Sequence, residues 1–131
     1  MKVQLITKIV HKASINAIEN KDTKSSDKQV KVHVRLDNEI FENSKDKKSF
    51  KVRYIAAIKL EHRVEINVEY DFHFTSSEEI NAETAKSSLF KSEIPSIAYP
   101  YLKVYVESMI NLSGIGNYLL PYFDFYADPF E

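Results

Sequence analysis

The chain of 131 residues contains no cysteine and only two glycines, Gly114 and Gly116. Without cysteine, the chain cannot form disulfide bonds, thiolate zinc sites or a cysteine nucleophile. Two glycines are also too few for a P-loop or for the G-x-G-x-x-G fingerprint of dinucleotide-binding proteins, because those loops need further glycines at fixed positions. These absences argue against action driven by a nucleotide, and we expect no cofactor.

Charge of one sign is not in excess either, since 18 lysines and arginines balance 19 aspartates and glutamates for a net charge of -1. A near-neutral chain has no basic surplus with which to bind nucleic acid or an anionic membrane. Apolar runs are too short to span a bilayer, and Lys8 interrupts the N-terminal run that a signal peptide would need. The composition is that of one globular domain, residues 1–131, for which we expect a cytoplasmic location.

Alternation of apolar and polar residues predicts four β-strands within residues 1–75. The first, about residues 3–18, has apolar residues at both odd and even positions, so the alternation does not decide which face is buried. Residues 19–28 are a run of mixed charges that predicts a mobile loop. The second strand, about residues 29–41, places on one face Val30, Val32, Val34 and Leu36.

The third and fourth strands form a predicted hairpin that turns at His62. An antiparallel pairing about this turn joins residues whose numbers add up to 124, such as Leu60 with Val64 and Phe50 with Phe74. One face of the hairpin is then wholly apolar, and the other face brings together the charged pairs Lys59–Glu65 and Arg53–Asp71. A shift by one residue would destroy both faces, so the pattern indicates a single register.

The period changes after the fourth strand, where Ser76 or Ser77 followed by two glutamates is typical of a helix start. This first helix is predicted to run toward Phe90. Pro95 is predicted to end it or to change its direction.

A second helix is predicted to reach Ser113, with Gly114 as its C-terminal cap. Pro100 either kinks this helix or marks its first turn. The predicted fold class is therefore α+β: a four-stranded antiparallel sheet in residues 1–75, a kinked helical region in residues 76–114 on one face of the sheet, and an extended apolar segment in residues 115–131.

The second predicted helix is apolar on two sides rather than one. Its two apolar rows are Ala98, Leu102, Tyr105, Met109 and Leu112, and Tyr99, Val106 and Ile110. A helix that lies on a single sheet needs only one apolar face, so the second face needs another partner. A second subunit or the apolar residues 118–126 of the same chain can supply it, and we expect an oligomer.

Residues 94–126 resemble the SecB family of export chaperones. Members of that family carry a Phe-Pro-Tyr motif in their long helix, and this chain has Tyr99-Pro100-Tyr101 at the equivalent place. In both cases four strands precede the motif. The likeness continues in the family's order, with small length differences, through Ser108-Met109, Gly114, Pro121 and Phe123-Asp124.

The resemblance implies an ATP-independent holdase, a homotetramer built as a dimer of dimers, which binds unfolded or partly folded client protein in apolar grooves. Carried over to this chain, it implies as client-peptide-binding residues Val32, Val34, Tyr99, Leu102, Tyr105, Tyr122 and Phe123. Together with the two-faced helix, it implies as oligomer-interface residues Tyr101, Val106, Met109 and Ile110. For each of these side chains, ordinary core packing is the alternative.

Two departures from the family pattern narrow the expected client. A full second helix has no room after Phe123-Asp124, and the family's Cys/His zinc cluster, which contacts the export ATPase SecA, has no counterpart. These departures favour a solitary SecB-like chaperone dedicated to one client, such as the antitoxin of a toxin–antitoxin module, over general duty in protein transport and translocation of precursors. The alternative is a small oligomeric accessory protein or phage-type structural protein that keeps the fold without binding clients.

The four histidines are widely separated, and none forms a His-x-His or His-x-x-x-His pair. We therefore expect no metal. The nearest candidate is the strand face that bears Glu69, Asp71 and His73, for which a solvated surface is the simpler interpretation. Because no Gly-x-Ser-x-Gly elbow or comparable nucleophile with a base is present, we expect no enzymatic activity.

Overall fold

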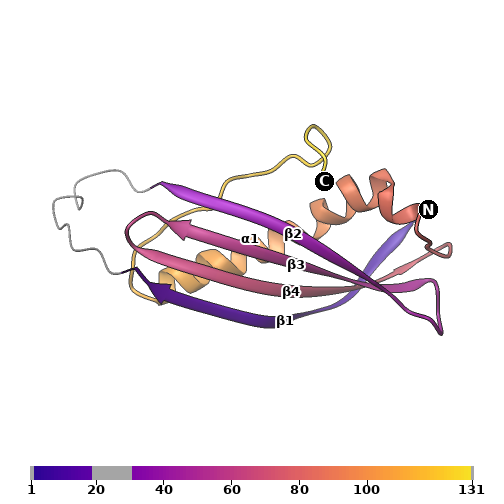
Figure 1. Ribbon diagram of the computed structural model, residues 1–131, viewed down its shortest axis with the longest axis horizontal. Helices are drawn as coiled ribbons and strands as arrows, with labels where there is room; N and C mark the ends of the chain where they lie inside the picture. The colour runs from indigo at the N-terminus through magenta and orange to yellow at the C-terminus, as the bar shows by residue number, and fades with distance from the viewer. Residues whose placement is uncertain (1, 19–30, 131) are drawn as a thin grey trace.

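The computed structural model describes residues 2–18 and 31–130 and has an α+β fold (Figure 1). Four antiparallel strands form one sheet in the order β1-β4-β3-β2. The strands are β1 at Val3–Ala17, β2 at Val32–Glu42, β3 at Ser49–Leu60 and β4 at Val64–Ser76. The predicted loop at 19–28 and the predicted strand positions 29 and 30, with Val30, lie outside the described residues.

Three helical elements follow the sheet. They are the 3₁₀ turn η2 at Thr84–Lys86, the π-helical turn η3 at Leu89–Glu93 and the helix α1 at Ile94–Leu112. Because η3 passes directly into α1, the two form one continuous helical run.

The β3–β4 hairpin has the predicted register, in which paired residues add up to 124 from Leu60 with Val64 to Ser49 with Thr75. His62 at its turn has a φ of 65°, in the left-handed region. Every second residue of both strands is buried on the inner face, and this apolar surface is the main part of the core. The prediction for the hairpin is thus confirmed.

The outer face of the hairpin carries the predicted pair of Arg53 and Asp71. Nε of Arg53 donates to one carboxylate oxygen of Asp71 over 2.7 Å, and Nη2 donates to the other over 3.1 Å. Burial alone would raise the pKa of Asp71, but the hydrogen bonds and the charge of Arg53 outweigh burial and hold this pKa below its usual value.

Strand β1 pairs with β4 irregularly, because the pairing skips Ile6 and His11. Each skipped residue is a bulge. After each bulge, the inward-facing side chains change between odd and even residue numbers. Leu5, Val10 and Ile15 therefore all lie opposite inward-facing residues of β4 and pack against the core, although their numbers alternate between odd and even. The bulges explain why inward-facing apolar residues have both odd and even numbers, whereas Ile6 and Ile9 are exposed.

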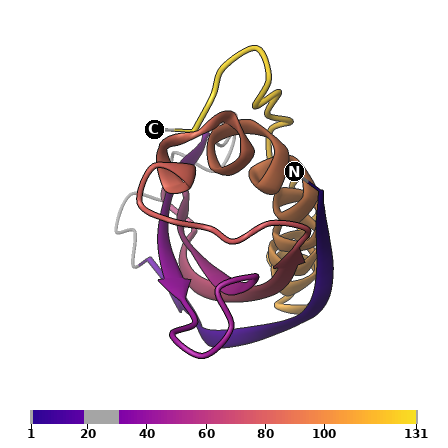
Figure 2. The same cartoon turned by 90° about the vertical axis from the view of Figure 1, so that its right-hand side faces the viewer.

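The sheet is strongly curved, and α1 lies on its concave side (Figure 2). The Tyr105 ring of α1 packs edge-on against Tyr70 of β4 with centroids 5.8 Å apart, and the Tyr101 ring lies 6.3 Å from Phe72. The Lys8 ammonium of β1 lies 5.0 Å from the centre of the Tyr101 ring. Helix α1 therefore covers β4 and β1 and leaves the concave face of β2 and β3 for other parts of the chain.

The helical region begins later than predicted, and the expected helix start at Ser76 or Ser77 is wrong. Ser76 still belongs to β4. Its N–H donates to the Lys48 carbonyl over 2.8 Å, and the Ser77 N–H donates to the Lys2 carbonyl over 2.8 Å. These bonds hold the backbone at the sheet, and the first helical turn is η2. Ahead of η2, the side-chain oxygen of Asn81 accepts hydrogen bonds from the N–H groups of Glu83 and Thr84.

The prolines and the glycine of the helical region have clear positions. Pro95 lies in the first turn of α1, where a residue without an N–H is tolerated, rather than at the end of a preceding helix. Pro100 lies inside α1. Gly114 follows the helix with a φ of 82°, which confirms the predicted C-terminal cap.

Candidate functional site

The C-terminal segment, residues 118–130, runs back along α1 toward η3 (Figure 1). The Glu107 carboxylate of α1 accepts a hydrogen bond from the Leu120 N–H over 2.8 Å and pairs with the Lys103 ammonium at 2.8 Å. The Tyr99 hydroxyl donates to the Pro121 carbonyl over 2.7 Å. Burial, followed by the nearby charge of Glu107, raises the pKa of Tyr99 to about 12. Side chains of α1 thus bind the backbone of the segment.

The second half of the segment is held by η3. The Ser92 hydroxyl, which is buried, donates to the Phe125 carbonyl over 2.8 Å. Further on, the Phe130 N–H donates to the Lys91 carbonyl over 2.7 Å. The segment is therefore fixed at both ends of the helical run.

Aromatic side chains of the segment connect α1 to the sheet. The rings of Phe123 and Phe125 lie 5.0 and 5.9 Å from the Tyr99 ring of α1, in edge-on geometry. The Phe130 ring lies 5.8 Å from Tyr54 of β3, also edge-on. Such pairs stabilise beyond the area they bury. The segment therefore covers the Tyr99 side of α1, which is one of the two coverings that the sequence left open.

We call the space between β2, β3 and α1 the inner groove, and its walls are the residues that face the C-terminal segment: Val34 and Leu36 of β2, Tyr54 of β3 and Tyr99 of α1. The C-terminal segment fills the groove only in part, since a cavity of about 430 Å³ remains between the segment and Val34 and Leu36. This cavity is the candidate site on the concave face.

One polar atom in the inner groove is left without a partner. The buried hydroxyl of Tyr54 makes no hydrogen bond with any described residue. Asn38 lies opposite Tyr54 in the strand pairing, and its side chain acts on the hydroxyl to lower the pKa of Tyr54 against the larger effect of burial. Burial raises the pKa of the Tyr54 hydroxyl, so this group stays neutral and is available as a donor and an acceptor.

The client-binding residues predicted from the sequence divide into two groups. Leu102 lies in the core and Tyr105 packs against Tyr70 of β4, and neither lines the cavity. Tyr122 lies on the rim of the groove with 83% exposure. The remaining predicted residues lie in or beside the groove and are buried or half-buried: Val32, Val34, Tyr99 and Phe123.

The predicted interface residues also divide. Val106 and Ile110 have 0% exposure because they pack in the core of their own chain. Their burial favours core packing, the alternative that the sequence left open, and the interface role of these two residues stays a prediction. Tyr101 is 43% exposed and Met109 is half-buried, so both keep surface that a partner subunit can cover. Val104, at 61% exposure on the same helix, was not predicted.

The sequence interpretation missed four residues of the inner groove, namely Leu36, Tyr54, Phe125 and Phe130. A signal existed for Leu36, which shares the alternation that singled out the two valines of β2. No local signal places Phe130 against Tyr54, because that contact depends on the path of the whole C-terminal segment.

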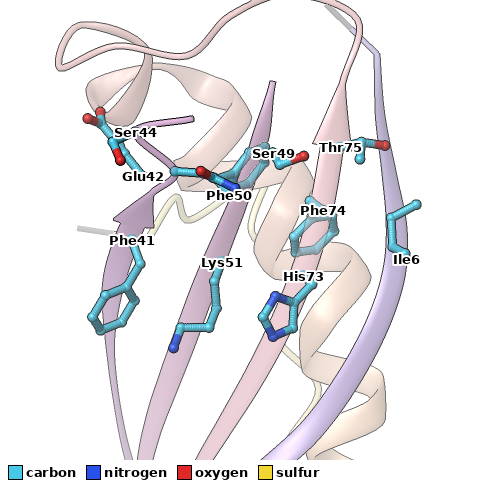
Figure 3. Close-up of a pocket in the computed structure, with 11 residues that line it drawn as sticks. Ile6, Phe41, Glu42, Ser44, Ser49, Phe50, Lys51, His73, Phe74 and Thr75 are labelled. Carbon is cyan, nitrogen blue, oxygen red and sulfur yellow. The ribbon is translucent and has the colours of Figure 1, made fainter. Parts of the chain in front are cut away.

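A second pocket, of about 480 Å³, lies on the convex face where β2 turns into β3 (Figure 3). Phe41, Lys51 and His73 lie side by side there on neighbouring strands. The Lys51 ammonium lies 4.4 Å from the centre of the Phe41 ring, and the Arg53 guanidinium lies 5.3 Å from it. The Ser49 hydroxyl donates to the Asp46 carboxylate over 2.8 Å, within the turn between β2 and β3.

Among residues 2–18 and 31–130, no three His, Asp or Glu side chains lie close enough together to hold a metal ion. On the strand face of Glu69, Asp71 and His73, Asp71 is paired with Arg53. No helix formed by these described residues is long and apolar enough to cross a membrane.

A four-stranded antiparallel sheet with one long helix on its concave side is the SecB-like fold, as the sequence predicted. The Rv1957 SecB-like chaperone of Mycobacterium tuberculosis, solved in complex with a ChAD peptide from the Rv1956 HigA1 antitoxin, matches with a TM-score of 0.75 and 10% identity over 93% of this chain and 88% of that chain. A protein of unknown function from Streptococcus agalactiae matches with a TM-score of 0.58 and 12% identity over 93% and 98% of the two chains. No protein-family model and no curated protein sequence matches the chain.

Proposed function

We propose that this protein is a chaperone that binds an unfolded or partly folded client polypeptide in the inner groove, without nucleotide or metal. The observation that carries the proposal is the C-terminal segment itself, because the groove already binds a stretch of polypeptide through backbone hydrogen bonds and aromatic contacts. The SecB-like fold supports the proposal, since the similar chaperone of Mycobacterium tuberculosis was solved with a bound antitoxin peptide.

The inner face of β2 supplies apolar surface for a client. Val32, Val34, Leu36 and Ile40 are only half-buried there. A client that covers them removes apolar surface from water, and each client side chain that becomes fully buried contributes about 1.5–3 kcal/mol before ordering costs. Such contacts keep unfolded chains apart without ATP.

The proposed client is a single dedicated protein, such as the antitoxin of a toxin–antitoxin module, and the proposed location is the cytoplasm. A pull-down of bound proteins from cells that make this protein tests the choice. One dominant partner is expected, whereas a broad set of precursors would instead indicate general export duty.

The proposed assembly is a homotetramer, a dimer of dimers. Tyr101 and Val104 on α1 supply exposed apolar surface for it, and Met109 adds a half-buried side chain. Light scattering on the purified protein is expected to give the mass of a dimer or tetramer, and Val104→Lys is expected to lower it. A monodisperse wild-type monomer would contradict the proposed assembly.

The proposed activity is tested by asking whether the purified protein, at equimolar ratio and without nucleotide, suppresses aggregation of an unrelated unfolded protein. Val34→Ser changes a wall of the inner groove, and His33→Ser is the matched control because His33 is the preceding residue of β2 and is exposed on the convex face. Val34→Ser is expected to weaken suppression several-fold, and His33→Ser is expected to keep it. If the wild type neither suppresses aggregation nor binds unfolded chains, the chaperone proposal is wrong.

One observation favours a second candidate function, a small oligomeric accessory protein or phage-type structural protein that keeps the fold without client binding. The C-terminal segment occupies the inner groove in the free chain, with Leu120 and Phe125 buried. If that occupation is permanent, no client binds. The aggregation assay separates the two functions.

A further inference from the structure

We propose that the C-terminal segment is a built-in occupant of the inner groove, and that a client binds by displacing it. This inference rests on the proposed function and adds the chemistry of the client to it. The client stretch that fits is one with an aliphatic side chain followed by aromatic ones, spaced like Leu120, Phe123 and Phe125.

The polar contacts in the groove are made to the main chain of the segment. Glu107 binds a main-chain N–H of the segment, and Tyr99 and Ser92 each bind a main-chain carbonyl. Main-chain groups are the same in every polypeptide, so these three side chains can bind a client at the same positions. The groove thus recognises a polypeptide backbone rather than one particular side chain.

The apolar contacts define which side chains fit. Leu120 and Phe125 are buried, and Phe123 is half-buried against Tyr99. The residues between and beside these anchors are exposed, among them Leu119, Tyr122 and Tyr126. The groove therefore takes one aliphatic side chain and, three and five residues later, two aromatic ones.

The segment satisfies the groove incompletely. The cavity of about 430 Å³ beside Val34 and Leu36 leaves their side chains without partners on one side. A client that fills the space beside Val34 and Leu36 gains apolar contacts that the segment does not make, and this difference drives the displacement.

Competition between segment and client has a measurable consequence. When a site is occupied by the protein's own chain, the apparent dissociation constant for a client is raised by the inverse of the fraction of molecules with an open site. Loosening the segment must therefore tighten client binding. A segment that is merely structural gives the opposite result, because loosening it only damages the site.

The experiment compares the full-length variants Phe125→Ser and Tyr126→Ser with the wild type. Phe125 anchors the segment, whereas its neighbour Tyr126 is exposed and does not line the cavity. The probe is fluorescently labelled, reduced and carboxymethylated α-lactalbumin, a permanently unfolded polypeptide, and binding is followed by anisotropy. Phe125→Ser is expected to lower the dissociation constant about tenfold, and Tyr126→Ser is expected to leave it within about twofold of the wild type.

Hydrogen exchange tests displacement directly in the wild type. The N–H groups of Leu120 and Phe130 are bonded to Glu107 and Lys91, and adding the probe is expected to speed their exchange. Unchanged or slower exchange, together with unchanged or weaker binding by Phe125→Ser, overturns the inference and leaves the proposed function standing. If no variant and no wild type binds the probe, the proposed function itself has failed.

A replacement variant and two further measurements complete the test. If circular dichroism shows that Phe125→Ser is unfolded, Leu120→Ser replaces it, because Leu120 is a buried anchor of the segment and not part of the groove that binds the client. A tightening of about threefold is then expected. A synthetic peptide of residues 118–130 is expected to compete with the probe for the variant. If labelled copies of the protein exchange the segment, the segment occupies the groove of a second chain. The proposal that it occupies the groove of its own chain is then wrong.

Discussion

Ile110→Ala is the change that best separates core packing from subunit contact on α1. Ile110 has 0% exposure, and the substitution removes three carbon atoms from the core. At about 0.8 kcal/mol for each buried CH₂ group, the lost transfer free energy is about 2.4 kcal/mol. The cavity left behind adds to this, so the free energy of unfolding is expected to fall by about 3–4 kcal/mol, within the range of such substitutions.

Urea denaturation followed by circular dichroism measures the effect. With a slope of about 1.5 kcal/mol per molar urea, the midpoint is expected to fall by about 2 M without a change in slope. The matched control is Leu112→Ala on the same helix, since Leu112 is 86% exposed and its loss is expected to change stability by less than about 0.5 kcal/mol.

Protein concentration decides between the two roles. If Ile110 belongs to the core of one chain, the difference between the midpoints of wild type and variant does not depend on concentration. If it contacts another subunit, the difference grows on dilution and light scattering shows a lower mass for the variant. A concentration-dependent difference would refute the burial of Ile110 as described.

Three further outcomes are expected. Tyr99→Phe removes the hydrogen bond to Pro121 and is expected to lower the free energy of unfolding by about 1 kcal/mol in urea titrations; an unchanged value would mean that the segment does not hold this bond in solution. Gly114→Ala places a side chain at a φ of 82° and is expected to lower the melting temperature measured by circular dichroism, by an amount equivalent to about 1 kcal/mol. Because Arg53 holds the pKa of Asp71 below its unfolded value, the stability that this carboxylate contributes is present above about pH 4 and is lost as pH falls through the lower folded pKa. Asp71→Asn should therefore flatten the pH dependence of unfolding in this acidic range, and an unchanged profile would contradict the assignment.

The hairpin of β3 and β4 was predictable because two independent patterns fix the same register. Its inner face is apolar at every second residue, and its outer face pairs Arg53 with Asp71. A shift by one residue violates both patterns at once. The facing of β1 was not predictable, since it depends on bulges at Ile6 and His11 that have no distinct residue type.

The candidate site was predictable only in part, because its contacts join residues far apart in the chain. Val34 could be placed on the inner face of β2 from alternation alone. The two apolar rows of α1 showed that two coverings were needed, but they did not show that Val106 faces the core while Tyr99 faces the C-terminal segment. That assignment depends on the path of the chain after Gly114.

The position of the C-terminal segment also sets the concentration against which a client competes. Only residues 113–117 join the segment to α1, so it meets the inner groove at an effective concentration on the order of millimolar, which does not change on dilution. A separate client competes at its own concentration in solution. At concentrations below millimolar, such a client occupies the groove only when its affinity for the open groove exceeds that of the segment by the same ratio.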